Sequence, residues 1–279
     1  MLPSFLLTLR EGLEAALIVG LALGVLAKMK RSQYAPAVWG GVGLAGLLSL
    51  GVALGLNALG AELTGAAEEI FEGVTMFLAA GVLTWMIFWM QRQGRQVQQG
   101  LEAEIRAAAG GPAGRGPGWG LFAIAFFAVL REGIETALFL TAAVFTSSAS
   151  ETLWGAVLGL AAAGLLGWWL FAAALRLNLR HFFQVTGGLL ILFAAGLVAH
   201  GVHEFNEAGL IPAVVEHVWN FNPLLDEKSP AGGLLTALFG YNGNPSLTEV
   251  LAYAAYFLAL FTSLWAAGQR RPLPAPVSD

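Results

Sequence analysis

The sequence lacks cysteine entirely. This absence excludes disulfide bonds, thiolate metal sites and thiol redox chemistry, so any bound metal must be held by oxygen or nitrogen ligands. Charged residues are also scarce, at 11% of the 279 residues, and no run of basic residues occurs. The scarcity of basic residues argues against nucleic acid as a partner.

Apolar residues and glycine are abundant instead. The chain is 57% hydrophobic and contains 36 glycines, and its mean hydropathy is +0.70. These values lie far outside the range of soluble domains and are typical of a polytopic membrane protein, in which small residues let helices pack closely. No basic residue precedes the first apolar run, which favours an uncleaved first span over a signal peptide.

Seven segments have the length of about 20 residues that crosses a bilayer. We therefore expect an all-α protein with seven transmembrane helices. The predicted spans cover 4–27, 36–57, 70–90, 118–146, 152–174, 183–203 and 247–267.

The charges of the connecting loops predict the orientation. Lys and Arg gather after the first, third, fifth and seventh spans, whereas the opposite loops carry the acidic residues. The positive-inside rule then places the N-terminus outside and the C-terminus in the cytoplasm.

A charged motif occurs twice. "LREGLEAAL" at 9–17 returns as "LREGIETAL" at 130–138, with seven of nine positions identical. The two motifs lie in spans of opposite predicted direction, which indicates two inverted three-helix repeats followed by a seventh helix. Inverted repeats with a site where they meet are typical of secondary transporters.

The repeat predicts how one permease domain, 1–279, is divided. The segment 93–117 is expected to be a short polar helix and a Gly/Pro linker that only joins the halves, and 205–246 is a candidate cover for the entrance. The predicted parts are the first repeat at 1–92, the linker at 93–117, the inverted second repeat at 118–204, the outer loop at 205–246, the seventh helix at 247–267 and a cytoplasmic tail at 268–279.

The motif places three charged residues within a predicted membrane span, where charges are energetically unfavourable. On a helix, Arg10, Glu11 and Glu14 face one sector, and each costs about 2.5–3.5 kcal/mol at a membrane helix centre. The second motif repeats this arrangement with Arg131, Glu132 and Glu135. One Arg for two Glu leaves a surplus carboxylate in each motif, which a divalent cation would neutralise. The alternative is an Arg–Glu pair that only locks helices together.

Further candidate ligands lie near the predicted outer surface. Carboxylates suit iron, manganese, magnesium or calcium, and imidazole favours a transition metal. The first group is Glu68, Glu69 and Glu72, and the second is His200, His203, Glu204 and Glu207. The alternative for the first group is a solvated helix start, and the alternative for the second is a set of polar caps at the membrane interface.

The doubled Arg-Glu-Gly-Leu/Ile-Glu motif resembles that of the oxidase-dependent iron transporter family, which comprises fungal high-affinity iron permeases and bacterial ferrous iron permeases. The resemblance covers nearly the whole chain. It implies a multi-pass protein of the cell (inner) membrane that takes up iron as substrate and has no cofactor. The essential residues would be the four motif glutamates, with Arg10 and Arg131 as counter-ions, and Glu69 and Glu72 resemble the family's outer acidic feature.

The resemblance also implies accessory proteins outside the membrane, either a ferroxidase or iron-binding and peroxidase partners, and it leaves room for a homo-oligomer. Other functions stay open at this point: a transporter or channel for another divalent metal such as lead or manganese, or a carboxylate-based membrane enzyme. The sequence contains no Gly-x-Ser-x-Gly or His-Glu-x-x-His motif, so we do not expect an enzyme.

Overall fold

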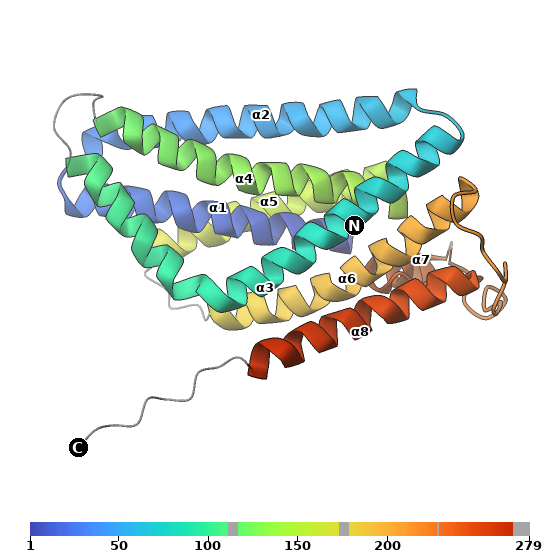
Figure 1. The fold of residues 1–279 in the computed structure, drawn as a ribbon. Helices are drawn as coiled ribbons and strands as arrows, with labels where there is room; N and C mark the ends of the chain where they lie inside the picture. Colours follow the sequence, from blue (N-terminus) through green and yellow to red (C-terminus); the bar gives the residue numbers. More distant parts are fainter. Residues whose placement is uncertain (111–116, 173–178, 228, 270–279) are drawn as a thin grey trace, which may run out of the picture.

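The computed structural model describes residues 1–110, 117–172, 179–227 and 229–269 (Figure 1). Residues 111–116 of the expected linker and 270–279 of the expected tail lie outside these ranges. All regular elements within the described ranges are helices. They are α1 (Leu2–Lys28), the 3₁₀ helix η1 (Ser32–Tyr34), α2 (Ala35–Glu62), α3 (Ala66–Gly110), α4 (Pro117–Thr146), α5 (Ala149–Ala172), α6 (Leu179–Glu207), α7 (Pro230–Phe239) and α8 (Leu247–Gln269).

Within the described ranges, five helical segments are long and apolar enough to cross a membrane. Large apolar side chains such as Leu47, Leu165 and Trp168 are exposed on their surfaces, as expected for side chains that face lipid. The helices α1 and α4 have 27 and 30 residues, but the charged motifs interrupt their apolar sequence. The five segments are Ser32–Glu62, Ala66–Trp89, Ala149–Leu170, His181–Glu207 and Leu247–Ala266.

The helices pair across the chain rather than in sequence order. The first helix, α1, packs along α5, and α4 packs along α2, while α3 and α6 pack against each other. Figure 1 shows α2 beside α4, and α8 beside α6. Small residues permit this close approach: a Cβ at Gly159 of α5 would lie 2.5 Å from the backbone oxygen of Phe5 and against the Thr8 hydroxyl of α1.

We expect Gly159→Leu to prevent α1 and α5 from packing. The side chain would have to displace the backbone of α1, and overpacking costs about 1–3 kcal/mol or more. Gly164→Leu is the matched control, because a Cβ at Gly164 has no neighbour within 4 Å among the described residues. The thermal midpoint and folded yield in detergent should fall for Gly159→Leu alone; equal midpoints for the two variants would contradict this packing.

The third helix extends well beyond its apolar part. It continues for 45 residues to Gly110, bends, and runs back across the ends of α1 and α4 (Figure 1). Ile105 and Ala109 of this extension are buried in an apolar cluster with Leu26 of α1 and Leu121 of α4. The segment expected only to join the halves therefore begins as a continuation of α3 that covers one end of the bundle.

One polar contact fixes the tip of this extension. Arg31, in the turn after α1, donates from Nη1 to the backbone oxygen of Ala109. A cation at the C-terminus of a helix is favourable because the last carbonyl groups carry partial negative charge. The contact therefore ties the end of α3 to the end of α1.

The segment 205–246, predicted to be an outer loop, contains a helix that the sequence analysis did not predict. The Ser229 hydroxyl caps the N-terminus of α7 by accepting from the Gly232 amide, and Gly240 ends it with φ of +67°. Gly240 lies against Gly196 in α6, where an added Cβ would come within 2.7 Å of the Gly240 Cα. Because α7 also contacts α1 and α4, this segment packs into the bundle.

Candidate metal site

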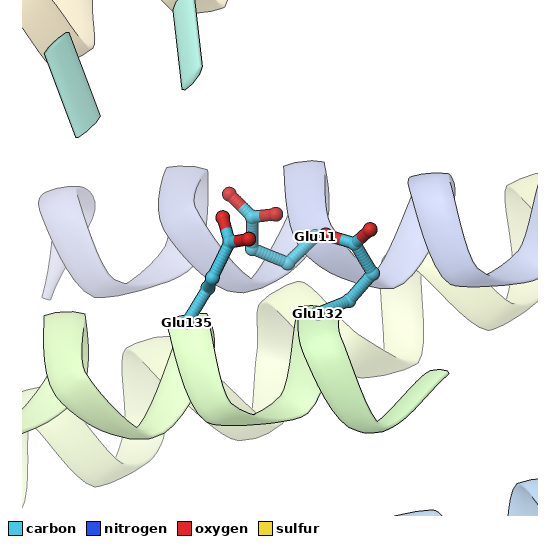
Figure 2. Close-up of side chains that lie close together, drawn as sticks. All are labelled: Glu11, Glu132 and Glu135. Carbon is cyan, nitrogen blue, oxygen red and sulfur yellow. The ribbon is translucent and has the colours of Figure 1, made fainter. Parts of the chain in front are cut away.

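The two motif helices run antiparallel and bring three glutamates together. Glu11 of α1 and Glu132 and Glu135 of α4 each have a carboxylate oxygen, and these atoms lie within 4.8 Å of one another. Figure 2 shows the side chains of Glu132 and Glu135 rising from α4 toward Glu11. The three residues are only 1%, 4% and 8% exposed. The arrangement matches the geometry of three oxygen ligands around one cation.

Each of these glutamates has an oxygen that lacks a hydrogen-bond partner. Within the described residues, the Oε2 atoms of Glu11, Glu132 and Glu135 are buried and accept no hydrogen bond. Burying an unpaired carboxylate oxygen is costly, and native proteins normally satisfy such atoms. A bound cation would satisfy all three at once.

Each motif arginine contacts the two glutamates of its own motif. Arg10 Nη1 lies 3.5 Å from Glu11 Oε1, and Arg10 Nη2 lies 3.3 Å from Glu14 Oε1. Arg131 Nε lies 3.1 Å from Glu135 Oε1 and 3.4 Å from Glu132 Oε1. The two arginines offset two of the four carboxylate charges, so a divalent cation would neutralise the remainder.

The fourth motif glutamate lies beside this group rather than in it. Glu14 is on the next turn of α1 from Glu11, and its side chain, 14% exposed, is ion-paired with Arg10. The sequence analysis predicted that all four motif glutamates take part in the site, and the structure brings three of them into one convergent group.

A cavity of about 350 Å³ lies between α2, α3 and α4. Glu68 and Glu72 of α3 line it, together with Asn57 of α2 and Thr141 of α4. Glu69 does not line the cavity and is half-buried. Sequence reasoning missed Asn57 and Thr141, although a lone polar residue within a long apolar span is a usable signal. The cavity therefore places the neutral side-chain oxygens of Asn57 and Thr141 beside the predicted acidic group, where they could act as metal ligands.

The N-terminal part of α3 and the C-terminal part of α6 cross at two glycine–phenylalanine contacts. Phe77 of α3 stacks on Phe205 of α6 at 5.5 Å between ring centroids. Each ring also lies over a glycine of the opposite helix, Gly201 or Gly73. This crossing brings carboxylates at these ends of the two helices close enough to repel one another. The interacting pairs include Glu72 with Glu204 and Glu72 with Glu207.

The predicted histidines have protein partners. His200 Nδ1 lies 3.1 Å from the backbone oxygen of Gly196. His203 lies between two carboxylates, with Nδ1 3.1 Å from Glu249 Oε1 and Nε2 3.3 Å from Glu207 Oε1. The contact of His203 with Glu249 connects α6 to α8, and metal binding by either histidine stays a prediction.

Glu249 completes this contact and was missed by sequence reasoning. The residue is 4% exposed, and its carboxylate also accepts from Asn242 Nδ2 at 2.8 Å and from the Ser246 amide at 3.0 Å. With each oxygen paired, Glu249 acts as a structural anchor at the start of α8. An acidic residue at the start of an apolar segment is typical of an ordinary helix N-terminus. The sequence therefore does not indicate that Glu249 has this structural role.

Comparison with known proteins identifies the family. The model of the Iron permease FTR1 family matches residues 1–268. The chain belongs to this family. This iron permease is therefore a multi-pass membrane transporter and not an enzyme, and the family resemblance of its doubled motif is confirmed.

Three relatives show how far the similarity extends. The permease is 39% identical over 258 residues to the ferrous iron permeases EfeU of Escherichia coli O6:H1 and Shigella sonnei, covering 92% of this chain and 93% of each relative. It is 38% identical to the ferrous iron permease EfeU of Yersinia pestis, with 92% and 91% covered. No solved structure matches the permease.

Proposed function

We propose that this permease imports iron across the inner membrane by passing the ion through the buried glutamates of α1 and α4. The convergence of Glu11, Glu132 and Glu135, each with an unpartnered buried oxygen, is the observation that carries the proposal. Carboxylates are hard ligands that suit iron better than a soft metal ion. Membership of an iron permease family favours iron over lead or manganese.

The proposal includes seven spans, an outside N-terminus and two inverted repeats. The cross-pairing of helices supports the repeats, because each motif helix packs on the second helix of the other half. The motif glycines occupy corresponding places: a Cβ at Gly12 would lie 2.7 Å from the Ala163 Cβ of α5, and one at Gly133 would meet Ser49 of α2. Antiparallel motif helices bring the two half-sites face to face.

The outer carboxylates would collect the ion before it reaches the buried group. Acidic residues on crossing helices create a negative potential that attracts cations. In this proposal Glu68, Glu69 and Glu72 act with Glu204 and Glu207, and with the two histidines His200 and His203. Extracytoplasmic ferroxidase or iron-binding partners would deliver iron at the same surface.

The opposite end of the bundle is closed by apolar side chains. Residues that follow the motif in α1 and precede it in α4 pack with the α3 extension. The cluster includes Val19, Ala22, Leu26, Ile105, Ala109, Leu121 and Ala125. An ion leaving toward the cytoplasm would require these helices to separate, as in alternating access.

Metal uptake into proteoliposomes tests the function. We expect saturable uptake of Fe²⁺, with slower uptake of Mn²⁺, Zn²⁺ and Pb²⁺, and no uptake by a Glu11/Glu132/Glu135→Gln triple variant. Equal rates for all four metals would contradict the choice of iron, and non-saturable conductance would indicate a passive channel. Equal Fe²⁺ uptake by the triple variant would contradict the route.

A further inference from the structure

The segment 210–224, between α6 and α7, exposes many apolar side chains. The structure describes this segment throughout, and it forms no helix or strand. Val214 is 73% exposed and Leu224 is 86% exposed. A group of exposed apolar side chains on a connecting segment marks a surface that something else covers. The other exposed members are Leu210, Val215, Val218, Trp219 and Phe221.

Backbone hydrogen bonds fix the level of this segment relative to the apolar helices. The Leu247 amide donates to the Val215 oxygen, and the Val218 amide donates to the Pro245 oxygen. Leu247 is the first residue of the apolar part of α8, and the apolar part of α6 ends at Glu207. Figure 1 shows the segment at the end of the bundle where α6 ends and α8 begins. The segment therefore lies where the two apolar helices reach the boundary between hydrocarbon and water.

Val214 has a backbone conformation that valine rarely adopts. Its φ is +63°, in the left-handed region that is costly for a β-branched residue. Glycine adopts this region without strain, as Gly209 does nearby with φ of +72°. Packing against the protein does not compensate for this strain, because the Val214 side chain is largely exposed. A valine here is favourable if its side chain contacts an apolar environment outside the protein.

Charge and backbone geometry indicate which environment this is. No Lys or Arg occurs between 205 and 227, so the segment has no basic residue to attract an acidic partner or an anionic headgroup. The Trp219 and Phe221 rings lie 6.1 Å apart, and such residues favour the membrane interface. An irregular backbone is excluded from the hydrocarbon core, because its amides and carbonyls need water. The interfacial region supplies water for the backbone and acyl chains for the side chains.

We propose that the segment 210–224 inserts its apolar side chains into the adjoining leaflet and lies at the boundary between lipid headgroups and acyl chains. The inference goes beyond the proposed function, since it depends neither on the route of the ion nor on the orientation of the chain. The segment leads into α7, which contacts α6, α1 and α4. Lipid contacts on one side and helix contacts on the other would then hold the whole connection between α6 and α8.

Spin labelling of the full-length permease in phosphatidylcholine nanodiscs tests the proposal. Because the chain has no cysteine, each introduced cysteine carries the only label. For labels at Val214→Cys and Leu224→Cys we expect greater accessibility to oxygen than to a water-soluble nickel chelate, at a depth of about 5–10 Å. Leu258→Cys, at a 66% exposed position within α8, is the lipid reference. Glu62→Cys, at the exposed C-terminus of α2, is the water reference.

Three results would overturn the proposal. Labels at both positions as accessible to the nickel chelate as the Glu62→Cys label would show a water-facing surface that could bind a soluble partner. Dipolar broadening between labels of two copies in one disc would show that a second copy covers the segment. Insertion only after addition of phosphatidylglycerol would show electrostatic rather than apolar binding. If one labelled variant does not fold, the other position decides.

The labelling result is independent of iron uptake. Labels at the expected depth support the lipid contact even if the wild-type protein shows no glutamate-dependent Fe²⁺ uptake. Water-exposed labels beside normal uptake overturn the lipid contact and leave the proposed function intact.

Discussion

Glu135→Gln is expected to abolish iron uptake while the protein still folds. Glutamine has the shape of glutamate, and its amide oxygen can still accept from Arg131 Nε, which lies 3.1 Å from Glu135 Oε1. The substitution removes one charge from the convergent group of three carboxylates. We expect uptake at limiting Fe²⁺ to fall at least about 100-fold, equivalent to about 2.8 kcal/mol.

Glu102→Gln is the matched control for this substitution. Glu102 lies on the α3 extension and pairs with the exposed Arg106, so its charge is far less desolvated and contributes little. Both variants should show wild-type elution and thermal midpoints in detergent. Uptake by Glu135→Gln at even a third of the wild-type rate would show that the buried group does not carry the ion.

A disulfide between the α3 extension and α4 is expected to block uptake reversibly. A Cβ at Gly120 would lie 3.1 Å from the Ala108 Cβ, slightly closer than the roughly 3.5–4.5 Å of a disulfide. A small shift would therefore let Ala108→Cys and Gly120→Cys join. Since the chain has no cysteine, the two introduced thiols would have no competing partner.

Oxidation should stop Fe²⁺ uptake by the double variant, and reduction should restore it. The bond would hold together the apolar cluster that closes this end of the bundle. Each single cysteine variant is a control and should transport iron equally well with and without oxidant. Undiminished uptake by the fully oxidised double variant would show that the ion leaves without separation of α3 and α4.

The sequence predicted the parts of the site that depend on spacing within one helix. Glu132 and Glu135 share a face because they are three residues apart, and the repeat of the motif pointed to Glu11 and Glu14 together as their partners, without choosing between these two. The sequence also predicted that carboxylates would outnumber arginines. The structure brings Glu11, Glu132 and Glu135 together, and their role as metal ligands stays a prediction, which rests on the rarity of charges within apolar spans.

Features that depend on contacts between distant segments could not be predicted in this way. Ile105 and Ala109 are spaced like any amphipathic turn, and only the bend of α3 places them against Leu26. Glu249 has the sequence context of an ordinary helix start, and its pairing with His203 depends on how α8 lies beside α6. The stretch that forms α7 is short and rich in glycine, so packing against α6 rather than helix propensity explains it.

The continuity of α3 links the two ends of the proposed pathway mechanically. At about 1.5 Å per residue, 45 residues give roughly 68 Å of helix, more than twice the thickness of the hydrocarbon core. One backbone therefore carries Glu68 and Glu72 at the cavity between α2, α3 and α4, Trp89 beside Arg131, and Ile105 at the closed end. If this bent helix tilts as one body, all three sites move together. Separate helices could instead open both ends of the pathway at once, and ions would leak.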